Sequence, residues 1–480
     1  MQQKFIKNLA FLLILNIVVK PLWILGIQIT VQNRVGVDDF GMYFTLLNFG
    51  YLFFIITDPG LNNYTNRETS SNPSFLKSRF VTIGFLKLFL AVFYGIFMIT
   101  VGQYIMGYSP RFLELLLPVI LNIMLSSFLL FLRAALGGLQ LFVWDSIAGV
   151  LDRVLMIALC SVFLFAPALN NNFSIDLFIY LQTVAYVVSI IYGVVVLAVK
   201  KIPLEFRFNF SLLSEVLKNS YPYALLALLM SFYTRIDSVM IEKIYPAGAA
   251  EAGIYAQGYK LYEAGNMIAV LFAGLLLPVF SKMLANKEPV GQIADWSVRL
   301  LVIPAFFAAL YGTFFSHEII DVLFLNETAK TAAVFPVLMW AFVAVAFNYV
   351  YGTLLTAGGE LRFLNILSAG GLTVNLILNY LLIPRFGALG AAWATLATQG
   401  GVAGAQILKS FSSYPLQFKW GAALPVSALA GANILVFFLV RTLNLPAFPV
   451  LTMMIALTAT AVFYLKLIDI KALLKLLKNR

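Results

Sequence analysis

Lys20 is the residue of this chain whose chemistry is hardest to explain as purely structural. It lies near the middle of the first long apolar stretch, roughly residues 8–30. An ammonium group that deep in a membrane helix is costly unless an anion or water meets it, and such residues usually mark a substrate or ion pathway. So many intramembrane charges indicate a transporter with a wet, charged central cavity. Seven further ionisable residues lie inside apolar stretches: Lys87, Asp152, Arg153, Arg235, Asp237, Lys260 and Glu263.

Two interpretations of Lys20 follow from its surroundings in the sequence. Its own stretch contains no acidic residue, so a structural partner would have to come from another helix. In the alternative, Lys20 faces the cavity and meets the anionic head group of a substrate. The adjacent Pro21 has no amide N–H, and we expect it to bend the helix or to free a backbone carbonyl there.

A second group of charges occupies two consecutive apolar stretches. Arg235 and Asp237 lie in the first, and Lys260 and Glu263 lie in the second with the i,i+3 spacing of neighbours on a helix. These four side chains either compensate one another structurally or form a functional site. In the functional interpretation, Arg235 and Lys260 bind substrate, while Asp237 and Glu263 are carboxylates that take up H⁺ or Na⁺ during transport.

Asp152 and Arg153 raise the same choice, although adjacent residues point in different directions on a helix. The structural interpretation is favoured for this pair, with Arg153 as a further cavity cation and Asp152 as a further ion-coupling carboxylate in the alternative. Asn348, Asn375 and Asn379 lie in two later apolar stretches and need hydrogen-bond partners there. They suit a cavity wall that contacts sugars, and equally suit bonds between helices.

The composition places all of these residues in an integral membrane protein. The chain has 480 residues, of which 61% are hydrophobic and 11% charged, whereas soluble domains are about half apolar and a quarter charged. The single Cys and single His exclude a disulfide framework and a multi-histidine metal centre. No phosphate-binding loop of the GxxxxGK[ST] type is present, so we expect no nucleotide, metal or other cofactor.

Hydropathy predicts an all-α polytopic protein with about 14 transmembrane helices. With a cytoplasmic N-terminus, twenty Lys and Arg residues fall in inside loops and tails and six in outside loops. This asymmetry predicts that both termini are cytoplasmic, so most of the net charge of +11 reflects topology and not nucleic-acid binding. The first stretch is too long for a signal peptide, and we expect it to be retained as a helix. The predicted spans are 8–30, 41–61, 81–106, 112–131, 144–165, 176–199, 221–244, 252–280, 298–315, 332–356, 364–383, 388–408, 422–440 and 448–468.

Weak internal similarity predicts a duplicated six-helix unit. Gly41-x-Tyr43 recurs as Gly253-x-Tyr255 at an offset of 212 residues, and Gly137-Gly138 recurs as Gly358-Gly359 at an offset of 221. The two copies run in the same direction, so the repeat is parallel, about an axis along the membrane normal. We therefore expect an N-lobe at 1–200, a cytoplasmic linker at 201–220, a C-lobe at 221–409, and two appended helices with a basic tail at 410–480.

Several segments resemble polysaccharide-biosynthesis flippases, the Wzx-type repeat-unit flippases of the multidrug/oligosaccharidyl-lipid/polysaccharide (MOP) exporter superfamily. The similarity extends over nearly the whole chain and is carried by the overall pattern, since no single motif is specific. The segments are Lys20-Pro21, Val35-Gly-Val-Asp-Asp-Phe-Gly-Met-Tyr43, Asp58-Pro-Gly-Leu61, Arg133-Ala-Ala-Leu-x-Gly-Leu-Gln140, Tyr233-x-Arg-Ile-Asp237 and Ala252-Gly-Ile-Tyr255.

The resemblance implies two six-helix lobes around a central cavity that opens alternately to each side. It implies a polyprenyl-pyrophosphate-linked oligosaccharide as cargo and a bacterial cytoplasmic membrane as location. It also implies that Lys20, Arg235 and Lys260 are cavity cations. A lysine in the first helix acts as a point charge, whereas an arginine would bind a pyrophosphate with two parallel hydrogen bonds. A polysaccharide polymerase and a chain-length regulator are the protein partners we would expect.

Two other classes of function compete with a flippase. A cation-coupled drug antiporter of the same superfamily would use Asp152, Asp237 or Glu263, although the cations in the spans slightly outnumber these acids. A membrane glycosyltransferase or polymerase would use an acidic pair such as Asp38-Asp39. Such enzymes need large outer loops or a soluble domain, and the predicted loops are short, so we interpret Asp38 and Asp39 as turn residues and expect no enzyme.

Overall fold

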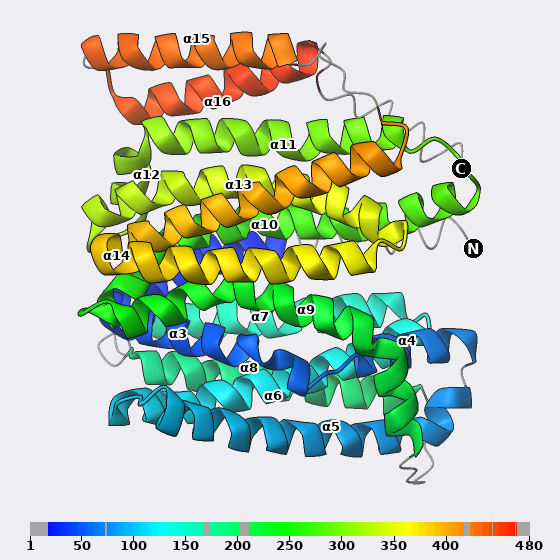
Figure 1. Cartoon of the computed structure of the whole chain (residues 1–480). Coiled ribbons are helices and arrows are strands. Elements are labelled where there is room, and N and C mark those ends of the chain that lie inside the picture. The colour runs from blue at the N-terminus through cyan, green and yellow to red at the C-terminus, as the bar shows by residue number, and fades with distance from the viewer. Residues whose placement is uncertain are drawn as a thin grey trace. The chain divides into compact units, whose positions relative to one another are not determined.

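The computed structural model describes residues 18–72, 74–166, 173–200, 211–416, 423–443, 445–465 and 467. Within these ranges every regular element is a helix, as predicted (Figure 1). Ten of the described helices are long and apolar enough to cross a membrane, and one of them, α14, contains two predicted spans. The all-α polytopic fold class is therefore confirmed, and the helix count is consistent with fourteen. The first seventeen residues, part of the linker and the basic tail lie outside the described residues.

The chain divides into two compact units, Met1–Ala256 (unit 1) and Gln257–Arg480 (unit 2). The division falls inside one long helix, α10. The predicted lobes, divided at the linker 201–220, remain a prediction about the repeat. The elements are η1 (Leu22–Gln28), α2 (Ile29–Val35), α3 (Val37–Leu52), η2 (Phe54–Ile56), α4 (Leu61–Ser71), α5 (Ser74–Thr100), η3 (Val101–Ile105), α6 (Pro110–Gly138), α7 (Phe142–Phe165), α8 (Ile175–Val199), α9 (Ser211–Ile244), α10 (Gly248–Ala285), α11 (Gly291–Phe314), α12 (Ser316–Leu323), α13 (Thr328–Ala357), α14 (Leu361–Ser413), α15 (Ala423–Thr442) and α16 (Ala447–Tyr464).

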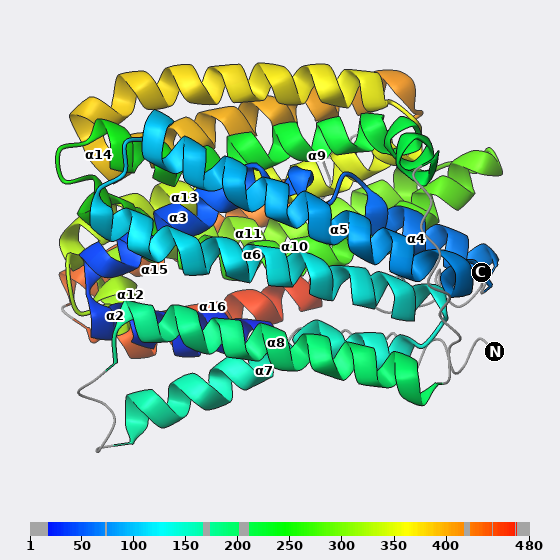
Figure 2. The ribbon, with the colours of Figure 1, turned by 90° about the horizontal axis from the view of Figure 1, so that it is seen from below.

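In unit 1, α6 packs against α3, α4, α5, α7 and α8, and α3 also packs along α9 (Figures 1 and 2). Figure 2 shows α5, α6 and α8 running along one another. Because α6 touches so many neighbours, its side chains are largely buried, and polar groups on it must find partners inside the unit. In unit 2, α13 packs against both α11 and α14.

The predicted second span, 41–61, is interrupted in the structure. Helix α3 ends at Leu52, a short 3₁₀ turn follows, and α4 starts at Leu61. The break lies at Asp58-Pro59-Gly60, where the proline cannot donate a backbone hydrogen bond and Gly60 adopts a φ of 99°. Helix α4 is too polar to be found by hydropathy, so the sequence analysis ended the span where the apolar residues end.

The helix around Pro21 is wider than an α-helix. Directly after the proline, residues Leu22–Gln28 have π-helical hydrogen bonding before the α-helical pattern resumes at Ile29. Segments of this kind are rare and often occur at functional sites. The expected disturbance beside Lys20 is thus present as a π-helical segment.

The two glycines of the first repeat signature meet at their backbones. A Cβ atom on Gly41 would lie 1.9 Å from the carbonyl oxygen of Ala249, and one on Gly253 would lie 2.1 Å from that of Val37. Val37 precedes Gly41 by four residues and Ala249 precedes Gly253 by four, so the two contacts are reciprocal. Gln32 adds a hydrogen bond from its Nε2 to the Gly253 carbonyl oxygen at 2.9 Å. The two signatures thus lie in direct contact, and the parallel repeat stays a prediction.

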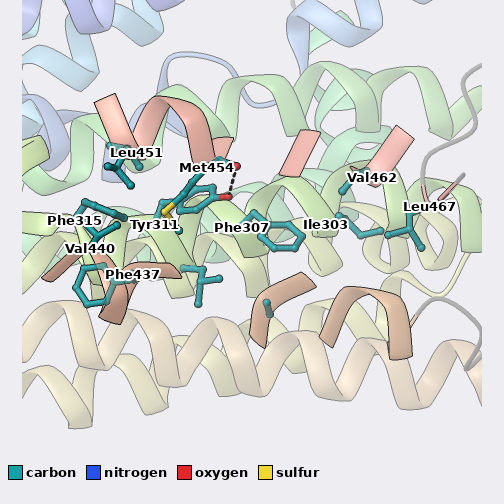
Figure 3. Packing of buried hydrophobic residues seen from close by; sticks show 13 residues of the cluster. Ile303, Phe307, Tyr311, Phe315, Phe437, Val440, Leu451, Met454, Val462 and Leu467 are labelled. Atoms are coloured by element: carbon teal, nitrogen blue, oxygen red, sulfur yellow. Dashed lines mark hydrogen bonds between the residues drawn. The ribbon is translucent and has the colours of Figure 1, made fainter. Parts of the chain in front are cut away.

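The appended helices α15 and α16 are attached to α11 by an apolar cluster with a polar centre (Figure 3). The Tyr311 hydroxyl lies 2.7 Å from Thr458 Oγ1, 3.0 Å from Asn433 Oδ1 and 3.1 Å from the Met454 carbonyl oxygen. Asn433 and Thr458 also bond to each other, with 3.0 Å between Asn433 Nδ2 and Thr458 Oγ1. Polar groups buried between helices stabilise a packing only when each is paired, so this network fixes how the three helices align.

The contact between Gly41 and Gly253 gives a test of stability. Gly41→Ala places a methyl group on the backbone of α10, and overpacking of this kind destabilises by about 1–3 kcal/mol, or more where backbone must move. We expect a clearly lower melting temperature for the detergent-solubilised protein. The matched control is Gly404→Ala, because no atom lies within 4 Å of a Cβ there. Equal melting temperatures for the two variants would contradict the described contact.

Candidate functional site: a cation cluster in unit 1

Lys20 lies among charges from two other helices. The half-buried Lys20 side chain feels the electrostatic fields of Arg133 on α6 and of Asp152 and Arg153 on α7. Two of these neighbours are cations and one is an anion, so the surroundings of Lys20 are positive overall. The structure thus brings together three predicted site residues, Lys20, Asp152 and Arg153, and adds Arg133.

The Arg153 guanidinium is positioned by a carboxylate and an aromatic ring. Its Nη1 lies 3.6 Å from Asp152 Oδ2, and its guanidinium lies over the ring of Trp23 at 5.6 Å from the ring centre. The electrostatic neighbours of Arg153 also include the hydroxyls of Tyr43, Tyr51 and Tyr186. A planar guanidinium stacked on an aromatic ring keeps its orientation with little loss of side-chain freedom.

Arg133 is positioned by an ion pair and a glycine. Its Nε lies 2.9 Å from Asp145 Oδ1. A Cβ atom on Gly149 would lie 2.8 Å from the terminal nitrogen of the same guanidinium, so a larger residue there would have to displace the guanidinium from its described position. The sequence analysis missed Arg133 because the predicted span ended at residue 131, whereas α6 continues to Gly138. The signal that could have found it is the pair Gly137-Gly138, which ends the helix a full turn after Arg133.

Arg235 reaches the same group of tyrosines from α9. Its Nη1 donates to Asn48 Oδ1 at 3.0 Å, and its guanidinium lies 4.6 Å from the centre of the Tyr51 ring. Since Tyr51 is also an electrostatic neighbour of Arg153, it connects the two arginines. Helix α3 therefore supplies the uncharged side chains that hold cations from α7 and α9.

The charges of this cluster do not balance. Asp145 pairs with Arg133, and Asp152 pairs with Arg153. Within the part of the chain that the structure describes, neither Lys20 nor Arg235 forms an ion pair with a carboxylate. We call Lys20, Arg133, Arg153 and Arg235 the cation cluster. Two of its four charges are free of an acidic partner, so it is built to meet an anion, and the arginines can donate paired hydrogen bonds to phosphate oxygens.

The other predicted charges have partners of their own. The Tyr255 hydroxyl donates to Asp237 Oδ2 at 2.9 Å, and both side chains are buried in unit 1. Lys260 is buried in unit 2, and its Nζ lies 3.8 Å from Glu263 Oε2. Of the four charges predicted to compensate one another or to form a site, Lys260 and Glu263 contact each other, and the role of these residues in transport stays a prediction.

The three predicted sugar-contacting asparagines lie in unit 2. Asn348 donates from Nδ2 to Gln399 Oε1 at 2.9 Å, which joins α13 to α14. Asn379 donates to Asn375 Oδ1 at 3.1 Å, one turn away on the same helix, and both side chains are fully buried. The contacts with sugars remain untested.

Lys87, one of the ionisable residues found inside apolar stretches, is buried and paired. Its Nζ lies 3.7 Å from Asp58 Oδ1 and 3.1 Å from Asn62 Oδ1. The same Asp58 oxygen accepts a hydrogen bond from the Asn62 backbone N–H at 3.1 Å, so it caps α4. The ion pair therefore connects α5 to the break between α3 and α4.

Comparison with known proteins gives the family. A family model described as "Polysaccharide biosynthesis protein" matches residues 5–284. The chain belongs to this family.

Relatives of the chain include proteins named as flippases. An uncharacterized membrane protein of Methanocaldococcus jannaschii is 22% identical over 429 residues, which cover 82% of each chain. The lipid III flippase of Escherichia coli is 28% identical over 182 residues, 37% of this chain and 43% of that protein. A probable low-salt glycan biosynthesis flippase, Agl15 of Haloferax volcanii, is 27% identical over 214 residues, 43% of this chain and 44% of that one.

Solved structures show the same fold at low sequence identity. The lipid II flippase MurJ in an inward closed conformation has a TM-score of 0.68 at 14% identity, covering 97% of this chain and 99% of that chain. An inward-facing multidrug resistance MATE family transporter of the MOP superfamily has a TM-score of 0.63 at 14% identity, covering 83% and 93%. The polysaccharide biosynthesis family and the fold of the MOP superfamily, expected from the sequence, are thus confirmed.

The buried pair of Lys87 and Asp58 gives a second test of stability. Lys87→Met leaves the Asp58 carboxylate, whose side chain is only 13% exposed, without its cation, and breaking a buried pair costs roughly 3–5 kcal/mol. Lys330→Met is the control, since its ion pair with Glu327 is exposed and such pairs contribute about 0–1 kcal/mol. We expect a much larger loss of unfolding free energy for Lys87→Met, measured by denaturant unfolding in detergent. A double variant with Asp58→Asn should recover part of the loss, and no recovery would contradict the pairing.

Proposed function

We propose that this protein is a flippase that moves polyprenyl-pyrophosphate-linked oligosaccharide repeat units across the cytoplasmic membrane. The cargo would serve the synthesis of a surface polysaccharide such as O-antigen, capsule or exopolysaccharide. The observation that carries the proposal is the cation cluster, in which Lys20 and Arg235 have no carboxylate partner among the described residues. The membership of a polysaccharide biosynthesis family and the flippase relatives support it.

The chemistry of the cargo agrees with these side chains. A pyrophosphate cannot cross hydrocarbon unaided, because the cost of moving an ion into a low-dielectric medium is of the order of tens of kcal/mol. In the proposal, Lys20 attracts the pyrophosphate as a point charge, and Arg235 donates hydrogen bonds to its oxygens. The polyprenyl tail stays in lipid, the sugars occupy a wet cavity, and the lobes open alternately to the two sides.

The proposed setting is the cytoplasmic membrane of a bacterial cell, with both termini in the cytoplasm. Membrane lipids surround the protein, and a polysaccharide polymerase and a chain-length regulator would receive the flipped units. The proposed activity changes no covalent bond of the cargo, so the protein would not be an enzyme.

A cation-coupled multidrug antiporter is the second candidate, because the fold is shared with MATE transporters. A cationic drug would need acidic residues free to meet it. Asp152, Asp237 and Glu263 each have a partner, in Arg153, Tyr255 and Lys260. The excess of cations in unit 1 favours an anionic cargo over this alternative.

Lys20 variants test the proposed cargo. We expect Lys20→Ala to lower flipping of the pyrophosphate-linked oligosaccharide by about tenfold or more, since a bond to a charged group contributes about 1.5–3 kcal/mol and 1.4 kcal/mol is tenfold. Lys20→Arg, which keeps the charge, should retain most of the flux. Lys282→Ala removes an exposed lysine and serves as control. The measurement is translocation in proteoliposomes, scored by protection of the glycan from an external glycosidase.

A second cargo makes the assay specific for the pyrophosphate. The same oligosaccharide on a polyprenyl monophosphate carries less charge, so wild type should flip it more slowly, and Lys20→Ala should reduce this difference. Near-normal flipping of the pyrophosphate cargo by a folded Lys20→Ala protein would contradict the site assignment. Flipping of drugs and not of glycolipid by wild type would favour the antiporter.

A further inference from the structure

Glu242 is a carboxylate in unit 1 that has an oxygen buried without a partner. It lies in the last turn of α9, and its Oε2 is buried and makes no hydrogen bond. An ionised carboxylate oxygen that is removed from water and receives no donor is costly. The C-terminal end of a helix adds to the cost, because the helix dipole disfavours a negative charge there.

A second unpartnered oxygen lies close to Glu242. The hydroxyl of Tyr108, in the turn between η3 and α6, is also buried without a hydrogen bond, and the electrostatic field of Glu242 reaches it. The Tyr108 ring is held by aromatic neighbours. It stacks on Phe112 at 5.1 Å between ring centres and meets the edge of Phe49 at 5.5 Å. A potential donor and a potential acceptor are thus buried near each other without being bonded.

The charges around Glu242 do not neutralise it. The ionic group whose field reaches the carboxyl is Lys243, the next residue on α9. The Lys243 side chain is exposed, and its Nζ lies 5.7 Å from the centre of the Tyr108 ring, not within ion-pair distance of Glu242. Helix α3 contributes the uncharged Phe49 to this region, α6 contributes the uncharged Phe112, and the turn before α6 contributes Tyr108.

The backbone holds Glu242 in this position. The turn that joins α9 to α10 is so tight that a Cβ on Gly248 would lie 2.1 Å from the Glu242 carbonyl oxygen. The backbone of this turn therefore has little room to shift, and Glu242 Oε2 stays buried while the rest of the side chain is partly exposed. The burial of Oε2 without a donor disfavours the ionised carboxylate relative to the neutral acid in the described conformation.

We propose that Glu242 is the site at which this protein binds and releases a proton during its transport cycle. The inference deepens the proposed function, because it names the coupling ion and the residue that carries it. A proton binds to Oε2 in the described conformation. It leaves when a rearrangement at the end of α9 lets the Tyr108 hydroxyl or water donate to the carboxylate. Asp152, Asp237 and Glu263 were the candidates from sequence, and their partners leave Glu242 as the stronger one.

The position of Glu242 on α9 connects the proton to the cation cluster. Glu242 follows Arg235 by seven residues, which is two helical turns, so the two side chains leave the same face of the helix about 10 Å apart along its axis. Arg235 is bonded to Asn48 and stacked on Tyr51, and Tyr108 packs on Phe49, so all three contacts involve about one turn of α3. A change in how α9 packs on α3 would therefore act on both sites.

Infrared difference spectroscopy tests the proton site without any cargo. For the full-length protein in liposomes, we expect a carbonyl-stretch band of a protonated carboxyl at neutral pH that disappears at high pH. Glu242→Gln should remove this band. Glu114→Gln, at an exposed glutamate on α6, should leave it unchanged. In Tyr108→Phe the band should persist to higher pH, because the anion loses its prospective donor.

Flux measurements test the coupling. In the proteoliposome assay, an imposed proton gradient should accelerate flipping by wild type and by Glu114→Gln, and this acceleration should be lost in Glu242→Gln. A band that survives in Glu242→Gln, or flux that still responds to the gradient in that variant, would overturn the inference. If wild type flips no glycolipid but the band titrates and depends on Glu242, the proton site stands and the proposed cargo is wrong. Glu242→Gln is nearly isosteric, and its melting temperature compared with wild type checks that it folds.

Discussion

The cost of holding a charge away from water governs how unit 1 is built. In a soluble protein, the side chains of Lys20, Arg133, Arg153 and Arg235 could extend into solvent. On packed membrane helices, each of these charges needs nearby groups that stabilise it. Asp145 and Asp152 stabilise two of these cations, and aromatic rings, hydroxyls and an amide from η1, α3 and α8 stabilise the cluster without adding charge. Such neutral groups stabilise a cation without cancelling its charge. These contacts lower the energetic cost of placing the cation cluster in a membrane, and the cluster keeps a net positive charge.

The stabilisation of cations by uncharged side chains also explains the importance of α3. Its residues Asn48 and Tyr51 hold Arg235, and its first turn meets α10 through the contact of Gly41 with Gly253. The backbones of α3 and α10 approach so closely at Gly41 and Gly253 that even a Cβ atom would not fit between them. The two helices therefore have little freedom to slide past each other at that point. Helix α3 is thus fixed at one end by glycine and ends at Leu52, before the capped break at Asp58.

Much of the fold could be predicted from the sequence, because long apolar stretches that must satisfy their own backbone form helices. Predictions were weaker where a helix is polar, or where it continues beyond the end of an apolar stretch. Helix α4 was missed because its residues are polar, and Arg133 was left outside a span because the apolar run ends before the helix does. The Gly400 and Gly404 pair has the spacing of a close helix contact, yet no atom lies within 4 Å of a Cβ at either residue. Spacing alone does not say which face of a helix meets a neighbour.

The site was harder to predict than the fold. Whether a charged side chain is structural or free to bind a substrate depends on which side chains contact it in the fold, and the sequence does not show these contacts. Sequence identified Lys20, Arg153 and Arg235 as charges in apolar surroundings, but not that Asp152 engages one of them and leaves the others uncompensated. It pointed to Asp237 and Glu263 as coupling groups and did not single out Glu242. Permanent cations can bind an anion but cannot release it without a change in their surroundings. A group on the same helix as Arg235 that gains and loses a proton supplies such a change, since its charge and its hydrogen bonds alter how α9 lies against α3. The uncompensated cations and the unpartnered carboxyl are in this sense two parts of one requirement: a site that holds an anionic head group must also have a way to let it go.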